Sequence, residues 1–179
     1  MARSRIEFAD LRLRPHYLWL KQWLLLTAGD FSKGDFNSMT VGWGSFGTMW
    51  NKPFAQIVVR PTRYTYGFLE RYDFFTLCVF PEPFRKDLVT LGTKSGRDGD
   101  KMAEVKITPK ASTLIAAPGF TEAELTVECR KIYSSDFEPA RFLDARIEKQ
   151  YPEKDYHRVY FGEISAIFGE PQYSVNDKE

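Results

Sequence analysis

Residues 37–50 read NSMTVGWGSFGTMW, and this stretch limits the possible folds more than any other part of the chain. Gly42, Gly44 and Gly47 match the G-x-G-x-x-G spacing of a dinucleotide-binding loop. That loop requires a helix to begin at the glycines, so that the helix N-terminus faces a pyrophosphate. Here Pro53 and the apolar run AQIVVR follow, which predicts a strand. The glycines therefore do not predict a Rossmann fold.

Two interpretations of these glycines stay open. In the first, they let main-chain N–H groups approach a planar ligand without obstruction by side chains. In the second, they accommodate the curvature of a barrel, and Trp43 and Trp50 belong to the core. A serine hydrolase is not predicted, because a nucleophile elbow around Ser45 would need glycine at position 43.

The rest of the chain predicts a mainly β domain. Most apolar segments are short, rich in β-branched or aromatic residues, and bounded by Gly, Pro, Asn or Asp. We expect strands at residues 23–28, 38–45, 54–60, 74–80, 103–107, 123–134 and 158–168, enough to close a barrel. Helical spacing is clearest at residues 65–72 and 83–92, a further turn is expected at 137–143, and the polar chain is expected to fray from Pro171.

Composition narrows the class of protein. A chain of 179 residues is long enough for one domain with a core of its own, and its formal charge of +1 supplies no general field for nucleic acid or an anionic membrane. Cys78 and Cys129 lie in strand-like apolar contexts and are expected to be reduced core thiols, which indicates a cytoplasmic protein. Neither a signal peptide nor a membrane span is predicted, because Lys21 and Gln22 interrupt the first apolar run.

Two further segments are rich in cations and hydroxyl groups. Residues 60–65, RPTRYT, lie between an expected strand and an expected helix, where two guanidinium groups, two hydroxyls and helix N–H groups can converge on an anion. The alternative is a pair of surface arginines with a threonine N-cap. Residues 95–101, SGRDGDK, form a second polar segment that can equally be a solvated loop.

No metal site is predicted from these patterns. Asp98 and Asp100 lack the rest of a calcium-loop pattern. The two histidines, His16 and His157, are far apart in sequence and have no cysteine companions, so zinc has little support.

Taken together and in order, these segments resemble the flavin reductase-like family, also called the flavoredoxin or FMN-binding split-barrel group. The resemblance begins at LLTAGD (25–30), continues through the three segments above and resumes at DYHRVYFGEISAIF (155–168). It implies a Greek-key split β-barrel with a few short peripheral helices, which binds FMN non-covalently near the interface of a homodimer. One domain is then expected over residues 1–179, with an N-terminal extension at 1–20 and a polar tail at 171–179.

The same resemblance implies roles for individual residues. Asn37, Met39, Thr40 and Trp43 look like the strand that borders the isoalloxazine ring. In this chain, the residues that resemble the family's segment at the ribityl phosphate are Arg60, Thr62, Arg63 and Thr65. Ser95 and Lys101 resemble the loop that completes the anion site. His157 and Phe161 belong to the last matching segment, where they either border the ring or pack in the barrel. His157 is the one candidate for a catalytic side chain.

The function implied by the resemblance is that of an FMN flavoprotein, an NAD(P)H-dependent flavin reductase or a flavoredoxin-like electron-transfer protein. Hydride would pass from NADH or NADPH to the flavin, and electrons would then pass to a small molecule or a protein. An alternative on the same fold is a carrier or sensor that binds FMN without turnover. An alternative of another class is an OB-type module for single-stranded nucleic acid, in which Arg60, Arg63, Arg97 and Lys101 line a groove. The near-neutral charge argues against that module.

Overall fold

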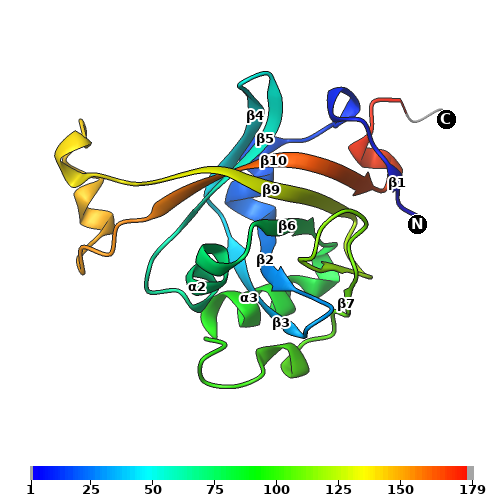
Figure 1. Cartoon of the computed structure of the whole chain (residues 1–179), viewed down its shortest axis with the longest axis horizontal. Coiled ribbons are helices and arrows are strands. Elements are labelled where there is room, and N and C mark those ends of the chain that lie inside the picture. Colours follow the sequence, from blue (N-terminus) through cyan, green and yellow to red (C-terminus); the bar gives the residue numbers. More distant parts are fainter. Residues whose placement is uncertain (1, 177–179) are drawn as a thin grey trace.

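Eight strands of the protein form one large antiparallel sheet in the computed structural model, which describes residues 2–176 (Figure 1). Within this part of the chain the strands are β1 (Ser4–Arg5), β2 (Leu24–Asp30), β3 (Asp35–Val41), β4 (Gly44–Met49), β5 (Lys52–Val59), β6 (Phe74–Val79), β7 (Pro109–Lys110), β8 (Gly119–Phe120), β9 (Leu125–Asp136) and β10 (Arg158–Gly169). The sheet has the order β3-β2-β6-β9-β10-β5-β4, with β1 added beside β10, and β7 and β8 form a separate pair. Since β3 and β4 end the sheet without pairing with each other, the curled sheet is an open barrel.

The predicted strand at 38–45 is two strands. β3 ends at Val41 and β4 begins at Gly44, and the two lie at opposite ends of the sheet. The Gly42–Trp43 pair is therefore the point where the chain leaves one edge of the barrel for the other. No helix begins there, which agrees with the rejection of a Rossmann loop.

The predicted strand at 103–107 is wrong. Residues Lys101–Glu104 form a 3-10 turn, whose N-cap Asp100 accepts a hydrogen bond from the amide of Met102 at 3.0 Å. A side-chain cap of this kind satisfies the turn locally, so that the short apolar run needs no partner strand. The other predicted strands overlap β2, β5, β6, β9 and β10.

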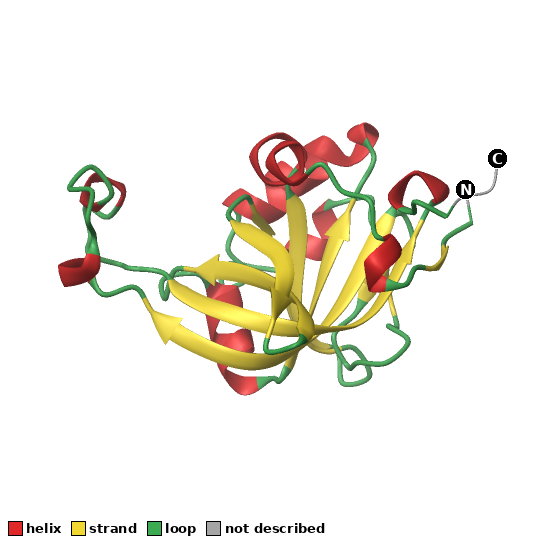
Figure 2. Cartoon of the chain, turned by 90° about the horizontal axis from the view of Figure 1, so that it is seen from above, coloured by secondary structure: helices red, strands yellow, loops and turns green. Residues whose placement is uncertain are grey.

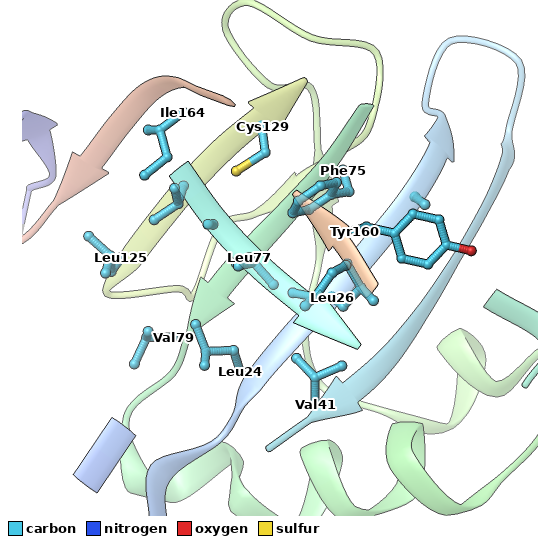
Figure 3. Close-up of a cluster of buried hydrophobic side chains, with 14 of the residues drawn as sticks. Leu24, Leu26, Val41, Phe75, Leu77, Val79, Leu125, Cys129, Tyr160 and Ile164 are labelled. Atoms are coloured by element: carbon cyan, nitrogen blue, oxygen red, sulfur yellow. The ribbon is translucent and has the colours of Figure 1, made fainter. Parts of the chain in front are cut away.

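The core lies between the curled strands (Figure 3). Leu24 and Leu26 of β2, Phe75 and Leu77 of β6 and Tyr160 of β10 are almost completely buried in it. Cys78 and Cys129 are both free and fully buried, and burial raises the pKa of each thiol. The prediction of reduced core thiols is therefore confirmed.

The described part of the chain has three short α-helices, of which the second and third pack against β3. They are α1 (Pro15–Tyr17), α2 (Tyr64–Arg71) and α3 (Arg85–Thr93), so both predicted helices are confirmed within a few residues. The Thr40 hydroxyl of β3 donates to the Leu88 carbonyl of α3 at 2.5 Å, which fixes α3 against the edge of the sheet. Residues Pro139–Arg141 form a single 3-10 turn inside the region where a turn was expected.

The two ends of the described chain pack together. β1 pairs with β10 at Phe168 and Gly169, and the Tyr173 carbonyl accepts a hydrogen bond from the Arg12 amide at 2.8 Å. The hydroxyl of Tyr173 also donates to Glu124 at 2.9 Å. The predicted fraying from Pro171 is therefore wrong for residues 171–176, because their backbone bonds to Asp10 and Arg12 of the N-terminal segment and Tyr173 bonds to Glu124. Residues 177–179 lie outside the described part.

An arm formed by residues 137–157 projects from the barrel between β9 and β10 (Figures 1 and 2). Aromatic side chains hold it together: the rings of Phe142 and Tyr151 stack with centroids 6.0 Å apart, and Tyr156 contacts both. The arm returns to the barrel at His157, immediately before β10. Its base therefore lies beside the end of β10 that carries the candidate site.

Candidate functional site

Two adjoining cavities lie where β3 meets α2, α3 and the base of the arm. The larger has a volume of about 390 Å³, and the smaller has a volume of about 110 Å³. They share Met39, Thr62 and Arg63, so they form one continuous depression. The larger is lined by Met39, Thr40, Val41, Gly42, Trp43, Val58, Val59, Arg60, Thr62, Arg63 and His157, and the smaller by Asn37, Met39, Thr62, Arg63, Tyr64, Thr65, Leu91, Gly92, Lys94, Ser95, Arg97 and Lys101. Every cofactor-binding candidate named from the sequence lines one of the two cavities.

Asn37 and Thr65 build the inner wall of the small cavity. Both side chains are buried, and Nδ2 of Asn37 donates to Oγ1 of Thr65 at 2.7 Å. The loop at Gly96 closes over them, since a Cβ at this glycine would lie 2.4 Å from Oδ1 of Asn37. This contact brings β3, the first turn of α2 and the 95–101 loop together, although they are far apart in sequence.

Lys101 is the most unusual group of the small cavity. It is only 5% exposed, and its Nζ donates to the carbonyl oxygens of Leu91 at 2.9 Å and Lys94 at 3.1 Å. Within residues 2–176, no carboxylate forms an ion pair with it. Burial and the nearby Arg63 charge lower the pKa of Lys101 to about 8. Lys101 is thus a buried cation without a counter-charge.

The other cations around the small cavity form hydrogen bonds or an ion pair with neighbouring residues. Arg63 donates to the Gly92 carbonyl at 2.8 Å, and Arg97 donates to the Thr62 carbonyl at 2.9 Å while its guanidinium lies over the Tyr64 ring. Lys94 forms an ion pair with Glu104 and is the neutralised member of the group. No carboxylate lines the described cavity, so its surface carries an excess of positive charge. This donor set suits an anion with several oxygens, such as a phosphate.

Arg60 belongs to the large cavity alone. Its guanidinium donates to Asp155 at 2.6 Å and to the Gln150 carbonyl at 2.7 Å, and it lies over the ring of Tyr151. The Asp155 carboxylate neutralises the positive charge that Arg60 brings to this wall of the cavity. The hydrogen bond from Arg60 also holds the pKa of Asp155 below its ordinary value. Arg60 therefore joins the arm to the cavity and lies apart from Lys101 and Ser95.

His157 forms part of the wall of the large cavity. Its Nδ1 lies 2.8 Å from the Tyr151 hydroxyl, and its ring lies 5.1 Å from the ring of Trp43. Burial, together with the charges of Arg60 and Arg63, lowers the pKa of His157 to about 4. The imidazole is therefore neutral at physiological pH. No described group forms a hydrogen bond with Nε2. Since Nε2 is not among the described buried atoms that lack a partner, it is accessible to solvent on a residue that lines the large cavity.

Trp43 and Trp50 are 48% and 55% exposed, so the interpretation that places them in the core is wrong. Gly44 nevertheless has a packing role, because a Cβ there would lie 2.3 Å from the Gln56 carbonyl oxygen and 2.5 Å from the Trp19 ring. Gly42, by contrast, lines the large cavity. The three glycines therefore do not share one role.

Phe161 is separate from the cavities. It packs against Phe54, Trp50 and Tyr133, with ring centroids between 5.2 and 6.0 Å away. The packing alternative for Phe161 is therefore confirmed.

Sequence reasoning missed the contribution of the arm. Tyr151 and Asp155 fix His157 and Arg60, and Tyr64 supports Arg97. Asp155 does lie in the matching segment that begins at residue 155, but Tyr151 lies outside it. No local pattern marks Tyr151, because its role depends on the return of the arm to the barrel.

Within residues 2–176, no three His, Cys, Asp or Glu side chains gather in a way that could hold a metal ion. In the same part of the chain, no helix is long and apolar enough to cross a membrane.

Comparison with known proteins gives a family match over most of the chain. The profile of the family described as "Flavin reductase like domain" matches residues 21–171. No curated protein matches the sequence significantly. Among solved structures, a flavoredoxin from Methanosarcina acetivorans is similar with a TM-score of 0.67 and 24% identity, covering 98% of this chain and 80% of that chain.

Two further solved structures share the architecture. An FMN-binding domain of flavin reductases-like enzyme from Shewanella baltica OS155 has a TM-score of 0.71 and 16% identity, covering 98% of this chain and 81% of that chain. A protein with a split barrel domain from Shewanella frigidimarina NCIMB 400 has a TM-score of 0.66 and 15% identity, covering 84% of this chain and 67% of that chain. The open barrel described above is therefore a split barrel, and the predicted fold class is confirmed.

Proposed function

Because the chain belongs to the flavin reductase-like family, we propose that it binds FMN non-covalently and is an NAD(P)H-dependent flavin reductase or a flavoredoxin-like electron-transfer protein. Two joined cavities of unequal size and charge support FMN as the ligand: a small cationic one for the phosphate and a large one for the ring system. The split-barrel fold leaves the OB-type hypothesis without support.

The observation that carries the proposal is the buried Lys101 without a counter-charge. Its ammonium group makes hydrogen bonds to two carbonyl oxygens, and an anion beside it would offset the cost of burying its charge. Phosphate binding by Lys101, Arg63 and Arg97, with Ser95 as a hydroxyl donor, satisfies this requirement, while the Thr62 hydroxyl donates to Asp155 at 3.4 Å. Thr65 and Asn37 shape the inner wall of the same cavity.

The ring system is assigned to the large cavity. Trp43 and His157 form one side of it, and Met39, Thr40 and Gly42 come from the end of β3. β3 pairs with β2 on one side and ends the sheet on the other, so its outer edge carries backbone donors and acceptors that belong to no ladder. Such groups suit the carbonyl and N–H edge of a flavin. Arg60 then lies beside the ring rather than at the phosphate.

When bound, FMN supplies the chemistry, since it takes up hydride from a reduced nicotinamide and returns electrons to a second acceptor. The side chains hold and orient the ring. Tyr151 has no other described acceptor for its hydroxyl hydrogen, so we assign it as the donor to Nδ1 of His157. The single proton of the neutral imidazole then sits on Nε2, which becomes a hydrogen-bond donor directed at the cavity.

The remaining parts of the proposal concern assembly and partners. We place FMN near the interface of a cytoplasmic homodimer, with a small molecule or a protein as the electron acceptor. Exposed aromatic residues next to the barrel, among them Trp50 and Tyr133, support an association of copies because such side chains are enriched at interfaces. Sedimentation of the purified protein measures the oligomeric state.

The test is spectroscopic. Purified protein should be yellow or should quench the fluorescence of added FMN at micromolar concentration, and bound FMN should bleach when NADH or NADPH is mixed in anaerobically. Colourless protein that quenches no FMN fluorescence would contradict the binding proposal. Bound FMN that fails to bleach with either donor would leave the carrier or sensor as the correct function.

A further inference from the structure

A third cavity, of about 250 Å³, adjoins the large cavity on the side of α3. The two share Thr40 and Gly42, and the third cavity is otherwise lined by Trp23, Leu88, Val89, Gly92 and Thr93. Apart from Thr40, Gly42 and Gly92, its lining residues have no role in the FMN site proposed above. Thr40 and Gly42 would contact both a molecule bound there and whatever occupies the large cavity.

The lining decides what kind of molecule fits. None of its described residues carries a charge, and the Thr40 hydroxyl is already bonded to the Leu88 carbonyl at 2.5 Å. Leu88, Val89 and Trp23 supply apolar surface, while Gly42 and Gly92 add no side chain. The volume is below the roughly 300–1,000 Å³ of pockets that hold drug-sized ligands. The cavity therefore suits a small, uncharged molecule, and its lining offers no cation to the phosphates of a dinucleotide.

Trp23 is held in place by unusual means. Its backbone has φ 65° and ψ 163°, a conformation that a bulky residue rarely adopts. The Trp23 amide closes the preceding turn by donating to the Leu18 carbonyl at 2.7 Å, and the Arg85 guanidinium lies 3.4 Å from the centre of the indole ring. Arg85 in turn donates to the Gln22 carbonyl at 2.8 Å. Strain of this kind persists where the surrounding structure fixes it, and it gathers at ligand sites.

We propose that this cavity binds an uncharged quinone ring, the molecule that receives electrons from FMN. This inference rests on the function proposed above. One face of the Trp23 indole is covered by Arg85, and the remaining face or edge stacks on the guest ring. Reduction of a quinone to a hydroquinone consumes two electrons and two protons. Reduced FMN supplies both electrons as it returns to the oxidised form, and the two protons are drawn from FMN and solvent.

The test measures the binding of 2-methyl-1,4-naphthoquinone to FMN-loaded protein by calorimetry, with no reductant present. Val89 is 43% exposed on α3, so Val89→Glu places a carboxylate at the cavity without disturbing the core. Lys86→Glu is the matched control, because it puts the same side chain on an exposed position of α3 outside the cavity. Val89→Glu should weaken quinone binding at least tenfold and leave the FMN affinity unchanged, whereas Lys86→Glu should change neither.

Further measurements distinguish failure of the cavity proposal from failure of the proposed function. 1,4-Naphthoquinone-2-sulfonate, which carries a charge, should bind more weakly than the neutral quinone, and equal or tighter binding overturns the assignment of an uncharged ligand. If FMN binds but the quinone does not, or if both variants behave like the wild type, the cavity proposal alone fails. If FMN itself does not bind, the proposed function fails.

If Val89→Glu instead shifts the sedimentation coefficient, the cavity is an interface between copies and the proposal is wrong. A melting curve for each variant identifies misfolding, and Val89→Phe, which fills the cavity with apolar volume, then serves as the second variant.

Discussion

The hydroxyl of Tyr151 lies 2.8 Å from Nδ1 of His157, and this bond attaches the projecting arm to the wall of the large cavity. Tyr151 is 3% exposed and packs against both the Phe142 ring and the Arg60 guanidinium, so its position is fixed by several contacts. An arm that appears separate from the barrel in Figure 1 thus determines how one cavity residue is oriented.

The first prediction concerns the tautomer of His157. Nitrogen NMR of the imidazoles at pH 7 should show His157 neutral with its proton on Nε2, because the Tyr151 hydroxyl donates to Nδ1. The spectrum is simple because the chain has two histidines, and a His16→Gln variant assigns the signals. Tyr151→Phe should remove this preference between tautomers. A proton on Nδ1 in the wild type would reverse the assigned donor.

His157 should also make stability depend on pH. Its pKa is lowered to about 4 in the folded protein from the ordinary value of 6.5, so the unfolded chain takes up a proton first as the pH falls. The free energy of unfolding should therefore decrease between pH 6.5 and 4, by up to about 2–3 kcal/mol from this group. His157→Asn, whose amide can still meet the Tyr151 hydroxyl, should lose less over the same range in urea titrations. Identical slopes for both proteins would show that His157 titrates normally.

Lys101 should discriminate between FMN and riboflavin. Lys101→Met keeps a similar volume but removes the charge, and it should cost about 1.5–3 kcal/mol of FMN affinity because a charge-assisted hydrogen bond to the phosphate is lost. Riboflavin, which lacks the phosphate, should be little affected. Lys94→Met, in which an ion pair with Glu104 is removed, should have a smaller effect on FMN. Fluorescence quenching gives all the affinities, and equal losses for both flavins would place the phosphate elsewhere.

The same lysine predicts a pH dependence of binding. The free protein has a Lys101 pKa of about 8, and a bound dianion would raise it, so binding favours the protonated form. FMN affinity should therefore fall as the pH rises above 8. Riboflavin affinity and FMN binding by Lys101→Met should not follow this fall. A flat profile for FMN would mean that Lys101 does not contact the phosphate.

Trp43→Ala should weaken both flavins without unfolding the protein. The side chain is 48% exposed and contacts His157, so its removal should cost less than about 1 kcal/mol of stability, compared with about 3–5 kcal/mol for a core tryptophan. The lost ring contact should reduce FMN and riboflavin affinity by a similar factor, on the order of tenfold. A melting curve and quenching titrations check both statements. A large loss of melting temperature would mean that Trp43 is structural.

Two glycines should respond in opposite ways to alanine. Gly44→Ala should destabilise the protein by at least about 2 kcal/mol, because the new Cβ would lie 2.3 Å from a backbone oxygen of Gln56. Gly67→Ala in α2 should stabilise it by about 0.5–1 kcal/mol, because the nearest neighbour of the new Cβ is the end of Arg71 at 3.8 Å. Denaturant unfolding measures both, and equal effects would contradict the close contact at Gly44.

The order of apolar and turn-forming segments by itself determined the mainly β class, most of the strands and both main helices, while the split barrel was implied only by the family resemblance. The alternation of apolar and polar residues, the capping residues and the turn residues are local signals, because each depends on a few neighbouring positions. The same logic predicted one strand across residues 38–45 and another at 103–107, and both were wrong. Whether a short apolar run pairs, turns or changes edges depends on partners far away in the chain, as the break at Gly42 and Trp43 shows.

For the candidate site, too, part of the information came from the sequence and part came only from the tertiary structure. Its residue types and their order came from the sequence and a family resemblance, and the tertiary structure brought those residues to two joined cavities. That Lys101 is buried without a counter-charge, that Arg60 turns toward Asp155, and that Tyr151 holds His157 were decided only by packing. The physical reason is that burial, charge compensation and hydrogen-bond direction depend on the distances between folded segments, which no local pattern of residues records.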